Sequence, residues 1–131
     1  MQFDYKKIAP GVLRPIIPIE LLHKGNVLRY EVLVDSGADA CIFPAEIGEL
    51  LGIDVASGKK DSVTGITGVP QTYYLHPLSI RIGVLAYVIE AGFLPHMADL
   101  GCGVVGQRGF FDLFRVVFDL QNERIELHPM S

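Results

Sequence analysis

The chain has 131 residues, of which half are hydrophobic and a fifth are charged, and its formal net charge is −4. This composition excludes a disordered chain and favours one globular domain spanning residues 1–131. The acidic balance and the scattered basic residues argue against nucleic acid as a partner. No apolar run approaches the roughly 20 residues that span a bilayer, and residues 1–7 lack the layout of a signal peptide. We therefore expect a cytoplasmic protein without a membrane partner.

The cysteine and histidine residues give no sign of a metal site. Cys41 and Cys102 lie far apart and form no C-x-x-C pair, so a zinc site or a disulfide framework is not expected. We expect buried thiols, as is usual in a reducing cytoplasm, although two cysteines could still form one bridge. The four histidines also lack the spacing of metal ligands; they are His23, His76, His96 and His128. We predict no metal and no cofactor.

The first half of the chain predicts a hairpin, a short strand and a short helix. The β-prone runs 16–22 and 28–34 flank a Gly/Asn turn at 23–26, which is typical of a β-hairpin. A short strand is predicted at 40–43. Residues 45–51 follow a proline, carry apolar side chains at helical spacing and precede a glycine, so they predict a helix.

The second half of the chain predicts three more hairpins and a helical turn at 110–113. The hairpin strands are 62–66 with 71–75, 78–82 with 85–89, and 115–120 with 124–127. About eight short strands with one or two short helices predict an all-β fold, a closed or folded-over β-barrel. No internal repeat is visible.

One glycine-rich motif has a competing interpretation. The sequence from Gly101 to Gly106 matches the dinucleotide-binding pattern G-x-G-x-x-G. That pattern is meaningful only where it follows a strand and opens a helix inside a βαβ unit. Because the residues that follow predict a hairpin, we do not expect a nucleotide site.

The most informative residues are Asp35, Ser36 and Gly37, which follow a strongly apolar strand. A buried strand that ends in a tight turn can hold one carboxylate rigidly, with the serine hydroxyl and the glycine N–H beside it. Acid–base activation of water by paired carboxylates needs two such groups that share one proton. This chain has the Asp-Ser-Gly turn once, and by itself such a turn is also a common structural feature.

The wider sequence resembles the retropepsin-like aspartic proteases over about residues 16–127. Val34-Asp35-Ser36-Gly37-Ala38-Asp39 is similar to their active-site loop, and Val104-Val105-Gly106 is similar to the hydrophobic-hydrophobic-glycine element behind that loop. Residues 65–69 stand where these proteins carry a glycine-containing flap hairpin. The resemblance looks closest to small bacterial retropepsin-like domains, and it implies the acid-protease β-barrel with one lobe per chain.

The resemblance also implies a catalytic arrangement. Asp35 of two chains would flank one water molecule across a two-fold axis, so the chain would act as a C₂ homodimer. Ser36 and Gly37 would orient the carboxylates. Further residues are implied to contact a peptide or protein substrate, and these are Ala38, Asp39, Gly65, Ile66, Gly68, Val69, Val104 and Val105. The supporting residues are implied to be Gly106 and Arg108.

The sequence departs from the retroviral pattern at one position. Retroviral members usually carry arginine directly after the glycine that corresponds to Gly106, where it pairs with the aspartate of the loop. Here Gln107 occupies that place and Arg108 follows, so Arg108 is the candidate partner of Asp39. The segments 1–12 and 125–131 are candidates for the dimer interface, and residues 1–15 form an extension before the core.

The leading hypothesis is therefore an aspartic endopeptidase whose substrate carries apolar side chains around the cleaved bond. The alternative is a non-catalytic peptide-binding or dimerisation module that keeps the same fold. A third hypothesis is a small ligand-binding barrel in which Asp35 only stabilises a turn.

Overall fold

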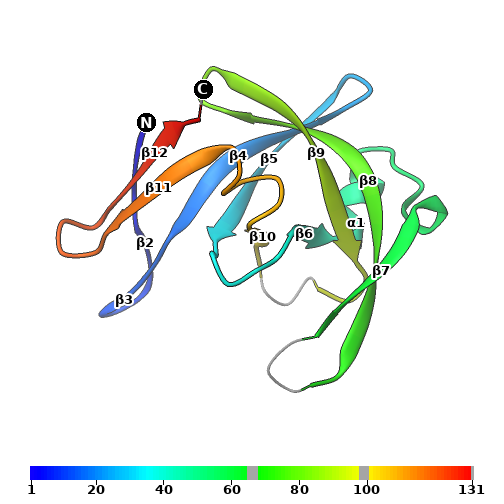
Figure 1. The fold of residues 1–131 in the computed structure, drawn as a ribbon, viewed down its shortest axis with the longest axis horizontal. Helices are drawn as coiled ribbons and strands as arrows, with labels where there is room; N and C mark the ends of the chain where they lie inside the picture. The colour runs from blue at the N-terminus through cyan, green and yellow to red at the C-terminus, as the bar shows by residue number, and fades with distance from the viewer. Residues whose placement is uncertain (65–67, 98–100, 131) are drawn as a thin grey trace.

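The computed structural model describes residues 1–64, 68–97 and 101–130, and it consists mainly of β-strands (Figure 1). The strands are β1 (Gln2–Asp4), β2 (Lys6–Ala9), β3 (Val12–Arg14), β4 (Ile16–His23), β5 (Asn26–Val34), β6 (Cys41–Pro44), β7 (Lys59–Thr64), β8 (Pro70–Ile82), β9 (Leu85–Leu94), β10 (Gly103–Val105), β11 (Phe114–Asp119) and β12 (Arg124–Pro129). They are accompanied by the helix α1 (Ala45–Leu50) and by a short 3₁₀ turn, η1 (Val55–Ser57).

A closed barrel forms the body of the protein. Within the described residues its six strands follow the order β4-β5-β10-β6-β9-β8, and β8 also pairs with β4 to close the ring. β10 runs parallel to β5 and antiparallel to β6, so it lies between the two strands that flank the Asp-Ser-Gly turn. β7 pairs with β8 and extends with it beyond the barrel (Figure 1). This architecture confirms the predicted all-β fold class.

Two small sheets accompany the barrel. β12 pairs with β1 on one side and with β11 on the other, so it is the central strand of a three-stranded sheet. β2 and β3 form a separate two-stranded hairpin. In Figure 1 the N-terminus and the end of β12 lie together at the upper left, whereas the β2–β3 hairpin extends toward the lower left.

The core is built from aliphatic and aromatic side chains of both the barrel and the three-stranded sheet. On β4 every second side chain is buried, as expected of a strand with one face on a core. The largest fully buried side chains are Phe43, Phe93, Phe110, Phe114, Ile17, Leu21, Leu51, Leu78, Ile80, Ile82, Ile125 and Leu127. Cys41 and Cys102 are buried free thiols, which confirms that expectation.

The predicted hairpins are present, with one difference in β8. β4 and β5 are joined by the two-residue turn Lys24–Gly25, in which both residues have positive φ, as a tight hairpin turn requires. The predicted strands 71–75 and 78–82 are one continuous strand. Pro77 separates the segment of β8 that pairs with β7 from the segment that pairs with β4. Among the described residues, one edge of β8 has no strand partner at Pro77, and a proline is compatible with such an edge position.

The helical predictions also agree with the structure. The predicted helix at 45–51 is α1 (Ala45–Leu50), and Gly52 follows it with a positive φ of 84°. The predicted turn at 110–113 is present, and in it the Leu113 and Phe114 N–H groups both donate to the Phe110 carbonyl, at 2.9 and 3.0 Å. Within residues 1–64, 68–97 and 101–130, no helix is long and apolar enough to cross a membrane.

Candidate active site

Asp35 is the first residue after β5, where the chain turns out of the barrel. Its N–H remains in the strand network and donates to the Val105 carbonyl at 3.0 Å. A β-turn follows, in which the Ala38 N–H donates to the Asp35 carbonyl at 3.1 Å. Inside this turn the Gly37 N–H donates to Asp35 Oδ1 at 2.9 Å, a contact that fixes the carboxylate. The Asp35 turn therefore presents a half-buried carboxylate in one defined orientation.

The segment after β10 holds the Asp35 turn in place. The Gln107 N–H donates to the Ala38 carbonyl at 2.8 Å, and Gln107 Nε2 donates to the Ser36 carbonyl at 3.0 Å. Gly106 lies so close to the turn that a Cβ on it would be 2.4 Å from the Ala38 carbonyl oxygen. Real Cβ atoms do not approach backbone oxygen so closely, so this contact requires glycine.

A cavity of about 540 Å³ lies beside the Asp35 turn. It is bounded by that turn and by the β7–β8 hairpin, and its lining residues are Gly37, Ala38, Asp39, Ala40, Ile42, Asp61, Ser62, Val63, Thr64, Tyr73 and Arg108. Ile42, Val63 and Tyr73 also belong to a small apolar cluster with Leu94 and Met97. The cavity thus has an apolar side, and its three charged residues (Asp39, Asp61 and Arg108) supply groups that can bind polar parts of a ligand.

The charged groups of this cavity change the pKa of Tyr73. Asp61 lies opposite Tyr73 in the register of β7 and β8. Burial, followed by the Asp61 carboxylate, raises the pKa of Tyr73, and the Arg108 guanidinium opposes this shift. The Tyr73 hydroxyl therefore stays protonated at neutral pH.

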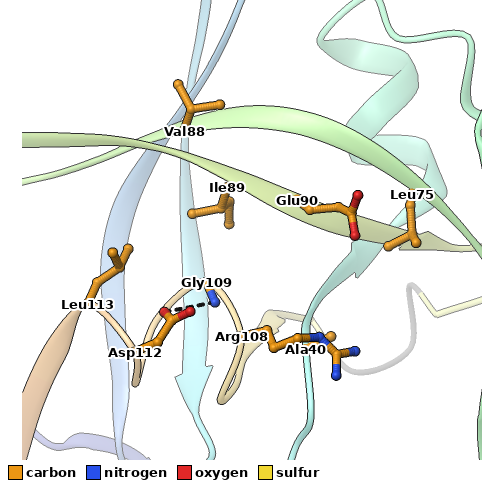
Figure 2. A pocket seen from close by; sticks show the side chains of 9 residues that line it. All are labelled: Ala40, Leu75, Val88, Ile89, Glu90, Arg108, Gly109, Asp112 and Leu113. Atoms are coloured by element: carbon orange, nitrogen blue, oxygen red, sulfur yellow. Dashed lines mark hydrogen bonds between the residues drawn. The ribbon is translucent and has the colours of Figure 1, made fainter.

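A second cavity, of about 260 Å³, shares Ala40 and Arg108 with the first (Figure 2). These two residues form a parallel β-bridge, so a main-chain contact separates the two cavities. The adjacent turn is closed by Asp112, which accepts a hydrogen bond from the Gly109 N–H at 3.0 Å (Figure 2). In the part of the chain that the structure describes, no ion pair engages the Arg108 guanidinium.

The structure brings Arg108 and Asp39 together through their main chains. The Arg108 N–H donates to the Asp39 carbonyl at 3.0 Å. The ion pair for which Arg108 was the candidate is absent among the described side chains, although both residues line the larger cavity. Main-chain hydrogen bonds thus join the Asp35 turn to the segment after β10, where an ion pair of the Arg108 side chain was expected to join them.

The predicted flap residues are only partly described. Gly65 and Ile66 lie outside the described residues. Gly68 has a positive φ of 76° and Val69 is 62% exposed, and both directly precede β8. Neither residue lines the larger cavity. Their assignment to substrate binding stays a prediction.

The two valines of β10 differ in their surroundings. Val104 is half-buried and packs against the small apolar cluster that contains Ile42 and Tyr73. Val105 is fully buried in the main core. The two side chains point to opposite faces of β10, and neither residue lines the larger cavity. Their assignment to substrate binding stays a prediction.

The sequence analysis did not identify Asp61, Tyr73 or Gln107 as site residues. Asp61 and Tyr73 are brought together by the register of β7 with β8. The hairpin predicted from the sequence in this region was the signal that could have placed these two residues opposite each other. Gln107 was noted only as a departure from the arginine pattern, and its side-chain contact with Ser36 depends on how β10 ends beside the turn.

The closed barrel, the Asp-Ser-Gly turn and the glycine element behind it together define the retropepsin-like fold, and comparison with solved structures agrees. A retropepsin-like aspartic protease from Rickettsia conorii superposes with a TM-score of 0.64 at 17% identity, covering 95% of this chain and 97% of that chain. EIAV protease, in a complex with the inhibitor HBY-793, superposes with a TM-score of 0.55 at 18% identity, covering 72% and 82%. No model of a protein family matches the sequence, and no curated protein matches it.

Proposed function

We propose that this chain is a homodimeric aspartic endopeptidase, in which Asp35 of two copies activates one water molecule. The observation that carries the proposal is the Asp35 turn itself. Its half-buried carboxylate is fixed by the Gly37 N–H at 2.9 Å, and the next residues of the turn, Gly37 and Ala38, line a cavity of about 540 Å³. The fold shared with aspartic proteases supports the same conclusion.

The chemistry follows from two carboxylates held close together. They cannot both ionise cheaply, so one proton is shared and the pair titrates in two separated steps. The ionised carboxylate takes a proton from water as the water oxygen adds to the scissile carbonyl carbon, while the protonated one donates to the carbonyl oxygen. Proton transfer to the amide nitrogen then breaks the C–N bond and releases an amine and a carboxylic acid, without a covalent intermediate.

The cavity supports an extended peptide as the substrate. Its apolar side, which includes Ile42 and Val63, fits apolar substrate side chains near the cleaved bond. The main chain of the Asp35 turn and the strands of the β7–β8 hairpin offer groups that pair with a peptide backbone, as in an added β-strand. In this proposal Ala38 leaves room for the substrate backbone, and Asp39 binds its N–H groups.

We expect the substitution Asp35→Asn to abolish peptidase activity. An amide cannot accept the proton of water, so the rate should fall by at least about 10²-fold. The measurement is cleavage of self-quenched fluorescein-labelled casein over the range pH 4–7, with the unfolding temperature followed in parallel. Asp54→Asn is the matched control, because Asp54 is an exposed carboxylate whose side chain caps no backbone group.

Full activity of the Asp35→Asn variant would contradict the proposal. An inactive wild-type chain that nevertheless binds unfolded casein would instead favour a non-catalytic peptide-binding module. The intact Asp-Ser-Gly turn argues against that alternative, since peptide binding alone does not need a fixed carboxylate.

A further inference from the structure

A further cavity of about 540 Å³ lies between the turn that joins β4 to β5 and the adjoining parts of β8 and β9. This hairpin cavity shares no lining residue with the cavity beside the Asp35 turn. Asn26, which begins β5, lines it, whereas Asp35 follows the other end of β5. A nine-residue strand such as β5 extends about 30 Å. In Figure 1 the β4–β5 hairpin accordingly points to the upper right, away from the turn after β5.

One wall of the hairpin cavity is apolar. Val27 is 52% exposed and Val88 is 76% exposed, and both line the cavity together with the buried Leu78. Pro77 and Ala86 add further apolar surface. Binding sites for small molecules are hollows of about 300–1,000 Å³ that are lined mainly by apolar side chains and by a few polar groups. The hairpin cavity has this size and this composition.

The polar groups of the hairpin cavity carry no negative charge. Lys24 lines the cavity with His23 and His76, and no aspartate or glutamate lines it. The chain as a whole has a formal net charge of −4, so a cavity with a lysine and no acid is a local exception. Among residues 1–64, 68–97 and 101–130, no ion pair engages the Lys24 ammonium group. A ligand carboxylate can therefore form a charge-assisted hydrogen bond with it.

One acidic residue, Glu90, lies beside the hairpin cavity without lining it. Glu90 is opposite Pro77 in the register of β8 and β9. It lines the cavity of about 260 Å³, which meets the hairpin cavity at Val88, the lining residue that both share. Figure 2 shows the Glu90 side chain extending toward Leu75 and away from Val88. A carboxylate bound by Lys24 therefore does not have to approach Glu90.

Hydrogen bonds hold two sides of the hairpin cavity in place. Asn26 Nδ2 donates to the Leu51 carbonyl at 2.9 Å, which ties the β4–β5 turn to the end of α1. His76 Nε2 donates to the Val55 carbonyl at 2.8 Å, which fixes the imidazole ring against η1. Binding to a preformed cavity avoids part of the entropy cost of ordering its walls.

We propose that the hairpin cavity is a second binding site, which takes a small apolar molecule carrying one carboxylate. The apolar body of the ligand lies against Val27 and Val88, and its carboxylate pairs with Lys24. A fatty carboxylate and the C-terminal end of a short apolar peptide both have this chemistry. The proposal does not depend on the proposed peptidase activity, because no residue of the Asp35 turn takes part.

The test is a titration of the isotope-labelled full chain with sodium octanoate, followed by amide NMR spectra. We expect saturable shifts at residues 22–27 and 86–88. Octanoate should bind at least about tenfold more tightly than butanoate, because it buries more methylene groups. Octylamine has the same chain length and the opposite charge, and it should bind at least about tenfold more weakly than octanoate. A parallel titration with N-acetylleucylleucine distinguishes the two sources, since the tighter ligand identifies the one that fits better.

Variants of Lys24 test the assigned cation. Lys24→Glu should weaken octanoate binding at least about tenfold, whereas Lys24→Arg keeps the charge and should stay within about threefold of the wild type. Lys7→Glu is the matched control, because it makes the same change of net charge at an exposed lysine that does not line the cavity. The variant Asp35→Asn should bind octanoate as the wild type does.

Four results would overturn the proposal. They are equal affinity for octanoate and octylamine, undiminished octanoate binding by Lys24→Glu, shifts confined to the Asp35 turn, and no binding of either octanoate or N-acetylleucylleucine. A dependence of the shifts at residues 22–27 on protein concentration, and not on added octanoate, would show that a second copy of the chain covers the cavity, and the proposal would also fail. None of these results changes the standing of the proposed peptidase.

Discussion

Gln107 shows how one side chain changes the construction of a site that resembles a known pattern. Its backbone N–H and its side-chain Nε2 donate to two different carbonyls of the Asp35 turn, those of Ala38 and Ser36. Retroviral members of the resembling family usually have arginine here and form an ion pair. In this chain the corresponding restraint is a pair of neutral hydrogen bonds from one residue to the main chain of the turn.

We expect Gln107→Met to lower the kcat of the peptidase by up to about tenfold, because one neutral hydrogen bond that orients the turn is lost. The KM should change little, since Gln107 does not line the cavity. The measurement is a full kinetic comparison with Gln107→Glu, a near-isosteric change that places a carboxylate against the Ser36 carbonyl and should be worse. Equal kcat values for the wild type and both variants would show that the turn does not need this contact.

Cys41 predicts a pH dependence of stability that is separate from catalysis. Burial raises the pKa of the Cys41 thiol from 9.0 to about 11. Above pH 9 the unfolded chain releases this proton while the folded chain retains it, so the unfolded state is favoured increasingly as the pH rises from 9 to 11. The free energy of unfolding should therefore fall by roughly 2 to 3 kcal/mol over that range.

The measurement for Cys41 is urea unfolding at a series of pH values, with Cys41→Ala as the reference. The variant is expected to be less stable at neutral pH but to lack this part of the pH dependence, so the difference between the two curves isolates the thiol. Parallel curves between pH 9 and pH 11 would show that the thiol is not shielded from water.

At the scale of elements, the site depends on where β10 ends against the Asp35 turn. Gly106 lies at this point, where the end of β10 crosses the Asp35 turn. A Cβ on Gly106 would lie 2.4 Å from the Ala38 carbonyl oxygen and 2.6 Å from the Ala40 carbonyl oxygen. Both contacts are with backbone, which cannot rotate away as a side chain can. The crossing therefore fixes the position of the turn relative to the barrel.

We expect Gly106→Ala to destabilise the protein by about 3 kcal/mol, the upper range for overpacking in a tight site. Gly101→Ala is the control, because Gly101 has a positive φ and, apart from its chain neighbours, no atom of the described residues lies within 4 Å of the added Cβ. That variant should lose only about 1 to 2 kcal/mol from backbone strain. Urea unfolding measures both, and a smaller loss for Gly106→Ala than for Gly101→Ala would mean that the crossing is not tight.

The elements also show which features local sequence patterns can predict. The strands β4 and β5, their two-residue turn and α1 all follow from short-range spacing of apolar residues, glycine and proline. The continuity of β8 through Pro77 did not follow, because it depends on partners that are distant in sequence: β7 pairs with one part of this strand and β4 with another.

At the scale of the whole molecule, the proposed function makes activity depend on assembly. We expect the specific activity to fall on dilution, because one chain supplies only one carboxylate. Addition of excess inactive Asp35→Asn chain should also inhibit the wild type, since a mixed dimer would carry only one Asp35 carboxyl group in its active site. The measurement is casein cleavage at a fixed wild-type concentration with increasing variant, and Asp54→Asn chain is the control. Specific activity that is independent of both dilution and added variant would indicate that a single chain is sufficient.

The class of fold and the position of the Asp35 turn could be predicted from the sequence, because both depend on local patterns: alternating apolar residues, turn glycines and an Asp-Ser-Gly after a buried strand. The surroundings of that turn became known only from the packing of the folded chain. The pairing of Asp61 with Tyr73, the contact of Gln107 with Ser36 and the burial of Val105 all arise from registers and crossings between segments far apart in the chain. Local propensities do not specify such long-range contacts. They are set by the closure of the barrel, in which each strand's position depends on all the others.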